Sequence, residues 1–298
     1  MTGILLMAFG GPEKKEDVRP FLANLMGSEP SPEVVALVIE KYELIGGGSP
    51  LPTITGRQAA GLQSALRKSG FDLPVAVGMK YWRPFIGTAV ASLVEEGANR
   101  IVALSMSPHR SRTTIGGYEK ELAEAKSAFP ELTIDLIADW YDDPGFLDAL
   151  AERAQEALLK FEGSDPEVIF TAHSVPLSHI EGGDPYAEQV KITAEGVAAR
   201  LGLRDAPVAF QSRGRSPGPW LGPDVEDVLK KLAAEGKRNV LLAPIGFVSD
   251  HLETLYDIDV VYRRKAQVFG LNLERAACLN DSPSFIRALA GIVKNRLI

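Results

Sequence analysis

The sequence alternates short apolar runs with longer segments that have a 3.6-residue hydrophobic period. Helical periodicity occurs between most of the runs, as in residues 59–68, 118–129, 146–161, 187–201 and 224–235. Strands that are apolar on both faces and alternate with helices form parallel sheets covered by helices on both sides. The sequence therefore predicts a doubly wound α/β fold. The eight predicted strands comprise residues 4–9, 74–79, 100–106, 133–138, 168–173, 207–211, 239–244 and 271–276.

The second half of the chain repeats features of the first half in the same order. Residues 4–12 (ILLMAFGGP) resemble residues 168–176 (VIFTAHSVP), and PVAV from residue 74 resembles PVAF from residue 207. Matches that keep one order along 298 residues favour a duplication, and this length suffices for two domains. We predict two similar α/β halves, residues 1–142 and 143–298. The sequence does not decide whether the last helix of the chain packs on the second half or returns to the first half.

Charge and cysteine content exclude several classes of protein. The net charge is −7 and no long basic run occurs, which argues against a nucleic-acid partner. The single cysteine, Cys278, cannot form an internal disulfide or hold an iron–sulfur cluster by itself. The first apolar run is too short for a secretory signal, and no later run is long enough to span a membrane. We expect a cytoplasmic protein without a transmembrane segment, and peripheral membrane contact stays open.

Several familiar catalytic and nucleotide-binding motifs are absent from the sequence. No G-x-G-x-x-G follows a strand, no G-x-x-x-x-G-K-[ST] occurs, and no G-x-S-x-G occurs. The glycine run of residues 46–48, before Ser49 and Pro50, follows a helical pattern rather than a strand. It fits either a helix stop or a close approach of backbone to a flat ligand.

Titratable residues gather at two predicted strand ends. His173 ends an apolar strand, where it is either a structural histidine or an imidazole that binds a metal or accepts a proton. In the segment SDHLETLYD from residue 249, Asp250 and Glu253 fit a capping box. Alternatively, Glu253 and Asp257 lie four residues apart on one helix face, where they repel unless a cation or proton lies between them. Imidazole and carboxylate ligands would suit a divalent metal.

Aromatic and basic residues also follow the predicted strands. Each aromatic residue alone fits core packing, but together they indicate an apolar pocket for a large flat ligand beyond the strand ends. Nearby cations would suit carboxylates of that ligand. The aromatic residues are Phe9, Tyr81, Trp82, Trp220 and Phe247, and the cations are Lys80, Arg83, Arg110, Arg112, Arg213 and Arg215.

Five segments resemble the ferrochelatase family in order along nearly the whole chain. The segments around His173 and Glu253 are specific to that family when they occur together. The resemblance implies two flavodoxin-like halves with a porphyrin cleft between them. It also implies a lyase that inserts ferrous iron into a porphyrin during haem biosynthesis. The segments are residues 7–12 (MAFGGP), 45–50 (IGGGSP), 171–176 (TAHSVP) with 183–186 (GDPY), 219–223 (PWLGP) and 249–256 (SDHLETLY).

The resemblance further assigns roles to individual residues. His173 and Glu253 match the family's metal-transfer and proton-accepting pair, with Asp257 as a third metal ligand. Where the family often continues this acidic line, the chain has Val261. We expect no permanently bound cofactor, no iron–sulfur cluster, and ferrous iron and porphyrin as substrates. The sequence is compatible with a monomer and does not decide the oligomeric state. The predicted substrate-binding residues are Phe9, Ser49, Lys80, Tyr81, Arg112, Tyr118, Trp220 and Phe247.

Three questions remain open: the class of protein, the residue that contacts iron, and the porphyrin substrate. The chain could insert cobalt or nickel into another tetrapyrrole, although such enzymes tend to use paired histidines, or it could be a non-catalytic two-lobed metabolite-binding protein. The sequence does not decide whether His173 or Glu253 contacts iron. We favour coproporphyrin III over protoporphyrin IX, because residues 42–45 (YELI) lack the arginine pair of animal enzymes. Leu22, Leu25 and Met26 argue the other way, since they could form an apolar lip for vinyl groups.

Overall fold

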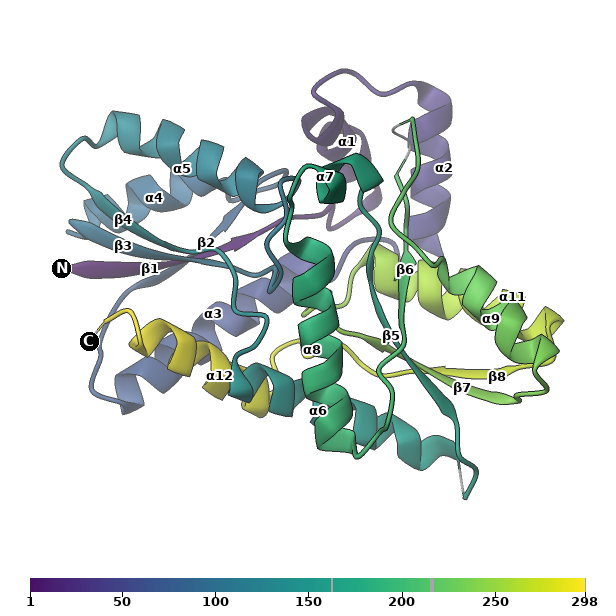
Figure 1. Cartoon of the computed structure of the whole chain (residues 1–298). Coiled ribbons are helices and arrows are strands. Elements are labelled where there is room, and N and C mark those ends of the chain that lie inside the picture. The colour runs from purple at the N-terminus through teal and green to yellow at the C-terminus, as the bar shows by residue number, and fades with distance from the viewer. Residues whose placement is uncertain (162, 215–216, 298) are drawn as a thin grey trace. The chain divides into compact units, whose positions relative to one another are not determined.

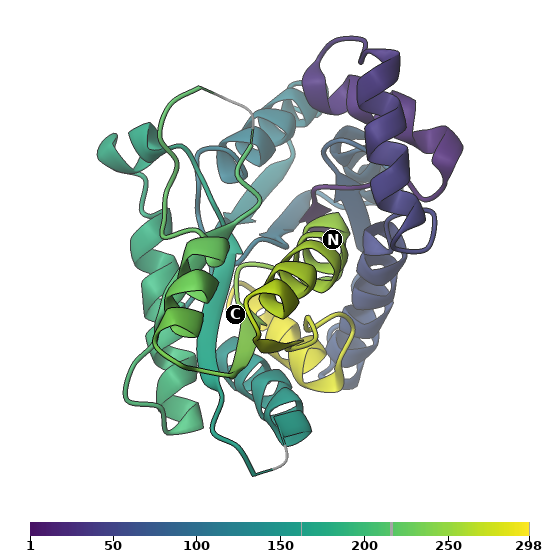
Figure 2. The same ribbon diagram turned by 90° about the vertical axis from the view of Figure 1, so that its right-hand side faces the viewer.

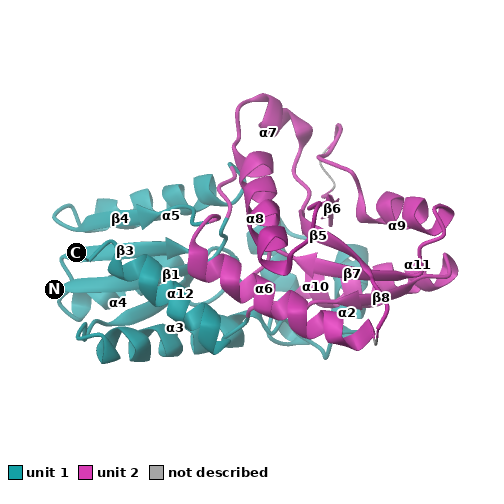
Figure 3. Cartoon of the chain, turned by 60° about the horizontal axis from the view of Figure 1, so that its bottom comes forward, with its two compact units in different colours: residues 1–108, 112–140, 280–298 teal, residues 109–111, 141–279 magenta. Residues whose placement is uncertain are grey.

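A computed structural model describes residues 1–161, 163–214 and 217–297 (Figure 1). The chain divides into two compact units that are discontinuous in sequence (Figure 3). Unit 1 contains Met1–Pro108, Arg112–Trp140 and the C-terminal stretch from Asn280, and unit 2 contains His109–Ser111 and Tyr141–Leu279. The end of the chain thus belongs to the same unit as its beginning.

Unit 1 is built on a four-stranded parallel sheet of order β2-β1-β3-β4. Its two internal strands have almost continuous apolar sequences, as in β1, where Ile4 to Met7 are all fully buried. A strand of this kind needs cover on both sides, which explains its continuous apolar sequence. The strands are β1 (Thr2–Ala8), β2 (Val75–Met79), β3 (Arg100–Ser105) and β4 (Thr133–Ile137).

Helices cover both faces of this sheet. On one face, α4 (Ile86–Glu95) and α5 (Ile115–Ala128) pack on Leu5, Met7 and Ile101. On the other face, α3 (Leu51–Lys68) lies beside the C-terminal helix α12 (Pro283–Lys294), as Figure 1 and Figure 2 show. The remaining elements are the 3₁₀ turn η1 (Lys15–Asp17), α1 (Val18–Met26) and α2 (Pro32–Glu43).

Unit 2 repeats the same strand order as β6-β5-β7-β8, again fully parallel. One face packs against α9, the π-helix η3 and α11 through Val225, Ile258 and Ala266, and α6 and α8 pack together elsewhere in the unit. The strands are β5 (Glu167–His173), β6 (Val208–Gln211), β7 (Asn239–Pro244) and β8 (Asn272–Arg275). The helices are α6 (Pro144–Leu158), η2 (Leu159–Phe161), α7 (Leu177–Glu181), α8 (Tyr186–Leu201), α9 (Val225–Ala234), α10 (Leu252–Leu255), η3 (Asp257–Tyr262) and α11 (Arg263–Val268).

The doubly wound α/β prediction is confirmed, and all eight predicted strands are present within a few residues of their expected bounds. The glycine run after α2 ends that helix, because Gly46 and Gly47 have φ values of 108° and 95°. Gly48 packs so closely on the Glu13 carbonyl that a Cβ would lie 2.0 Å from that oxygen.

Candidate active site

His173 lies at the carboxyl end of β5, an internal strand of the unit 2 sheet. Its Nδ1 donates to the backbone carbonyl of Ser174, so the tautomer is fixed and Nε2 is left for a partner beyond the strand. The hydroxyl of Tyr186, at the start of α8, donates to the His173 carbonyl at 2.9 Å. These contacts hold the imidazole at the end of the sheet in one orientation.

Glu253, on α10, is the partner of His173. Its Oε1 lies 3.2 Å from His173 Nε2, and its Oε2 lies 3.3 Å from His251 Nε2. The side chains of His173 and Glu253 are each 33 % exposed, so solvent or a substrate can reach the pair. One carboxylate therefore lies between two imidazoles.

The protonation of this pair follows from its geometry. Burial is the largest effect on His173 and acts to lower its pKa, but the charge and hydrogen bond of Glu253 outweigh it and raise the pKa of His173 to about 9. Burial also opposes ionisation of Glu253, yet His173 and His251 hold the pKa of this carboxyl well below its usual range. Near neutral pH the pair therefore consists of an imidazolium and a carboxylate.

Glu253 does not have the capping role that its sequence context also allowed. The N-cap of α10 is His251, whose backbone N–H donates to the hydroxyl of Thr254 at 3.1 Å. The backbone carbonyl of Glu253 accepts from Gln211 Nε2, at the end of β6, at 2.7 Å. The Asp250–Glu253 capping box is thus wrong, and the Glu253 carboxylate contacts two histidines instead.

Asp257 begins the π-helix η3 and accepts a hydrogen bond from the hydroxyl of Ser212. Ser212 follows β6 with a φ of 58°, a left-handed conformation that is uncommon outside glycine. The backbone N–H of Val261 donates to Tyr256 five residues earlier, at 3.0 Å. Among the residues that the structure describes, no three acidic, histidine or cysteine side chains converge on a common metal position. Of the predicted ligands, His173 and Glu253 are in direct contact, and the charge of Asp257 acts on His173.

Two predicted aromatic residues of unit 2 lie near this pair. The ring centroid of Phe247 is 6.4 Å from that of His173 and 4.8 Å from that of His251. Trp220 forms an isolated bridge with Pro176 in the turn that follows His173. Its indole packs on Gly214, where a Cβ would lie 2.7 Å from the ring. The structure thus brings both aromatic residues to the segments around His173.

In unit 1, Phe9, Tyr81 and Lys80 form one cluster beyond β1 and β2. The ring centroids of Phe9 and Tyr81 are 4.7 Å apart, and Lys80 Nζ lies 4.8 Å from the Tyr81 centroid. Phe9 is 44 % exposed, which is unusual for a phenylalanine that directly follows a fully buried strand. This cluster offers an accessible aromatic surface beside a cation.

The other predicted unit 1 residues differ in accessibility. Ser49 is buried against Gly11, and its Oγ accepts from the backbone N–H of Leu51 at 3.3 Å. Tyr118 is buried in the core of unit 1, where burial raises the pKa of its phenol. Arg112 is exposed. Arg215, which we predicted among the cations, lies outside the residues that the structure describes.

Sequence reasoning missed four side chains that hold the pair in place. Their positions carry a signal: the tyrosine ends the GDPY motif, the glutamine ends a predicted strand and the serine directly follows it, and the threonine directly follows Glu253. Polar residues at the carboxyl end of a buried strand are the general signal. The four are Tyr186, Gln211, Ser212 and Thr254.

Comparison with solved structures identifies the class of fold. SirB from Bacillus subtilis with Fe³⁺ aligns with a TM-score of 0.64 at 14 % identity, covering 99 % of this chain and 94 % of that one. CbiX, the terminal enzyme for biosynthesis of sirohaem in denitrifying bacteria, aligns with a TM-score of 0.57 at 15 % identity, covering 99 % and 100 %. The chain therefore shares the fold of these two proteins, built on two parallel α/β sheets.

Sequence comparison gives the family. The Ferrochelatase family model matches residues 1–297. The Ferrochelatase of Herpetosiphon aurantiacus is 40 % identical over 298 residues, which cover 98 % of both chains. That of Thermus thermophilus is 38 % identical over 314 residues, again 98 % of each. The chain belongs to the ferrochelatase family.

Proposed function

We propose that the His173–Glu253 pair of unit 2 is the centre at which ferrous iron enters a porphyrin and pyrrole protons leave. Membership of the ferrochelatase family gives the reaction, the insertion of Fe²⁺ into a porphyrin in haem biosynthesis. The observation that carries the proposed site is the 3.2 Å contact between His173 Nε2 and Glu253 Oε1. An imidazole and a carboxylate in contact can serve as a metal ligand and as a base.

The protonation of the pair suggests how the two tasks are divided. Insertion exchanges two pyrrole protons for one Fe²⁺, so the site needs a group that can accept a proton at once. Glu253 is an anion near neutral pH, whereas His173 carries a proton on each ring nitrogen. An imidazole must lose a proton before it binds a metal. We therefore assign His173 Nε2 as the atom that contacts iron after its proton has been released to solvent, which also removes one of the charges that lower the pKa of Glu253. Glu253 then accepts the two pyrrole protons in turn and passes each of them to solvent.

We further propose that the aromatic residues around this pair and the Phe9–Tyr81 cluster contact the macrocycle, and that Lys80 and Arg112 bind its carboxylates. An ammonium above an aromatic ring and an exposed guanidinium suit the propionates of a porphyrin. We keep coproporphyrin III, with four propionates, as the favoured substrate over protoporphyrin IX, with two. That the porphyrin lies between the two halves stays a prediction.

The remaining expectations also stay proposals. The single cysteine supports a protein without a resident cofactor or iron–sulfur cluster. Within the described part of the chain, none of the helices combines the length and the apolar character needed to cross a bilayer. A cytoplasmic location stays a prediction from the sequence, and peripheral membrane contact and a monomeric state stay open.

The function is tested by anaerobic incubation of the purified protein with Fe²⁺ and either porphyrin, followed by the Soret and visible bands. We expect insertion of iron, with the higher kcat/KM for coproporphyrin III. A clear preference for protoporphyrin IX would contradict the substrate proposal alone. If cobalt or nickel entered the ring and iron did not, the proposed metal would be wrong.

A further inference from the structure

We infer that Arg275, the last residue of β8, is a positioning residue for the Glu253 carboxylate. Its guanidinium ties the loop before α10 to the π-helix η3, and Glu253 lies on the segment between these two attachments. The inference rests on the role proposed above for Glu253 and adds a residue outside the predicted site.

The attachment to η3 is a two-point contact. Arg275 Nε donates to Asp259 Oδ1 at 2.9 Å, and Nη2 donates to Asp259 Oδ2 at 2.8 Å. Two parallel hydrogen bonds between a planar guanidinium and a carboxylate fix orientation as well as distance. The same guanidinium reaches Asp250, in front of α10, through Nη1 at 3.0 Å. One side chain therefore joins both ends of the segment that carries Glu253.

Two further contacts hold the segment, one within it and one from β6. Asp250 Oδ1 also accepts from the hydroxyl of Thr254 at 3.4 Å, directly after Glu253. Gln211, on β6, donates to the carbonyl of Glu253. Since β6 and β8 are the two edge strands of the unit 2 sheet, Glu253 is anchored to both edges, and Arg275 provides the β8 anchor.

The helix that follows Glu253 is of an uncommon kind. A π-helix is rare and occurs mostly as a single turn, often at a functional site. Asp259 lies inside η3, where its contact with Arg275 holds the π-helical backbone to the sheet. A small displacement of a catalytic group costs much activity, about 100-fold for an ångström. The 3.2 Å contact between Glu253 and His173 therefore depends on a firm attachment of η3.

Burial makes Arg275 difficult to replace. Its side chain is 10 % exposed, and those of Asp250 and Asp259 are 17 % and 29 % exposed. Without the guanidinium, two partly buried carboxylates would lose their shared counter-charge. We expect the segment to move so that these carboxylates reach solvent, which would displace Glu253.

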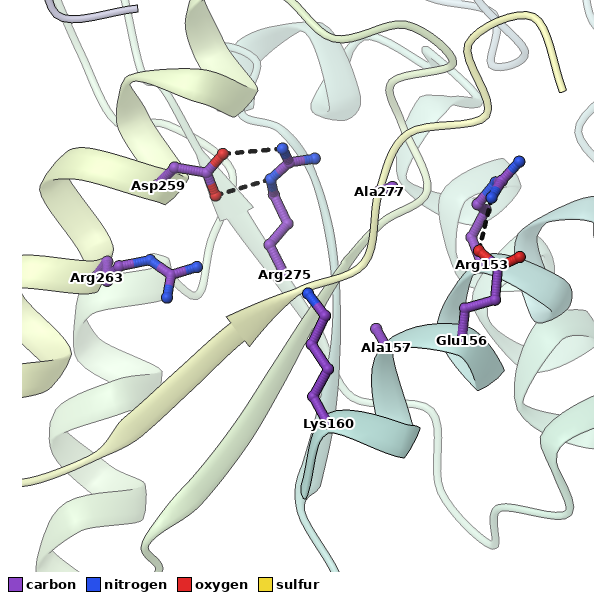
Figure 4. A pocket seen from close by; sticks show the side chains of 8 residues that line it. All are labelled: Arg153, Glu156, Ala157, Lys160, Asp259, Arg263, Arg275 and Ala277. Carbon is purple, nitrogen blue, oxygen red and sulfur yellow. Dashed lines mark hydrogen bonds and ion pairs between the residues drawn. The ribbon is translucent and has the colours of Figure 1, made fainter. Parts of the chain in front are cut away.

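A second arginine of the same pocket provides a matched control. Arg275 and Asp259 line a hollow of about 280 Å³ together with Arg153 and Lys160 (Figure 4). Arg153 pairs with Glu156 of its own helix, α6, at 2.6 Å. Arg153 therefore shares the pocket and the charge of Arg275, but its ion pair does not attach the Glu253 segment.

The test is a double-mutant cycle on the full-length enzyme. We would measure kcat for Fe²⁺ insertion, porphyrin Kd without iron, and melting temperature. The variants are Arg275→Gln, Arg275→Lys and Arg153→Gln, each with Glu253 and with Glu253→Gln. We expect Arg275→Gln to lower kcat about 10-fold to 100-fold, as loss of a group that orients a catalytic ligand does, with porphyrin Kd nearly unchanged. Arg275→Lys should restore part of kcat, and Arg153→Gln should leave it unchanged.

The variants that also carry Glu253→Gln distinguish a positioning role of Arg275 from general destabilisation. If Arg275 acts through Glu253, its replacement should change kcat by less than about threefold once Glu253 is glutamine. An equal loss in both backgrounds, or wild-type kcat in folded Arg275→Gln, would overturn the inference. If Arg275→Gln does not fold, Arg275→Lys is judged by the same two criteria. A wild type that inserts no iron would contradict the proposed function instead.

Discussion

The two units share one strand order but carry different chemistry at the carboxyl ends of their strands. In the internal sequence match, Phe9 of unit 1 corresponds to His173 of unit 2. The connection between the last two strands also differs: unit 1 uses the single helix α5, whereas unit 2 uses α10, η3 and α11. Unit 1 therefore presents an exposed aromatic cluster, and unit 2 presents an ion pair on an interrupted helix. In the proposed function, the same scaffold supports porphyrin binding in unit 1 and proton and metal transfer in unit 2.

The largest effect should come from His173. We expect His173→Ala to abolish iron insertion, a loss at the upper end of the range for proton transfer groups, about 10⁴-fold or more. The protein should stay folded, because the His173 side chain is one-third exposed and outside the core. Steady-state turnover and circular dichroism would check both points. Turnover near the wild-type level would remove the functional contrast between the units.

Glu253→Gln should have the next largest effect. The amide cannot accept a pyrrole proton, so we expect kcat to fall about 10²-fold to 10⁴-fold. Porphyrin binding, measured by fluorescence quenching, should change little. If the variant has a lower melting temperature but an unchanged kcat, Glu253 has a structural role instead.

The ion pair should also give unit 2 a pH-dependent contribution to stability. The pKa of His173 is raised from 6.5 to about 9 in the folded protein, so this stabilisation is complete below pH 6.5 and is lost as pH rises toward 9. We expect the difference in unfolding free energy between wild type and Glu253→Gln to shrink across this interval in urea titrations. If this difference in unfolding free energy stays constant from pH 6 to about pH 9.5, His173 and Glu253 do not form a stabilising ion pair.

Phe9→Ala should have the smallest effect. Because Phe9 is 44 % exposed, its removal leaves the unit 1 core intact. Ring contacts contribute about 0.5–1.5 kcal/mol, which corresponds to a rise in porphyrin KM of about twofold to tenfold with kcat unchanged. A large fall in kcat would place chemistry in unit 1 as well.

The internal strands were predictable because both of their faces are buried, which leaves a continuous apolar signature such as residues 4–8. Helix starts were less predictable: α3 begins at Leu51 rather than at residue 59, since Pro52 is tolerated in a first helical turn. The interruption of the helix after Glu253 could not be predicted from local sequence. It depends on side chains distant in the chain, with Ser212 holding Asp257 and Arg275 holding Asp259.

The candidate site was predictable only in part. Strand-end reasoning found His173, but its contact with Glu253 joins residues far apart in sequence, and family resemblance suggested that pairing. The same local pattern also fitted a capping box, which the structure excludes because His251 is the N-cap. Local helix propensity cannot decide between a capping role for Glu253 and a contact with His173, because the outcome depends on which strand ends lie beside α10.

The most direct test of the central claim is a single-turnover measurement with porphyrin already bound. Wild type, His173→Ala and Phe9→Ala would be saturated with porphyrin anaerobically, mixed with Fe²⁺, and followed by the change in the Soret band. We predict that Phe9→Ala inserts iron at the wild-type rate once saturated, whereas His173→Ala holds porphyrin but inserts no iron. Insertion by His173→Ala at the wild-type rate would contradict the claim that the ion pair of unit 2 performs the chemistry.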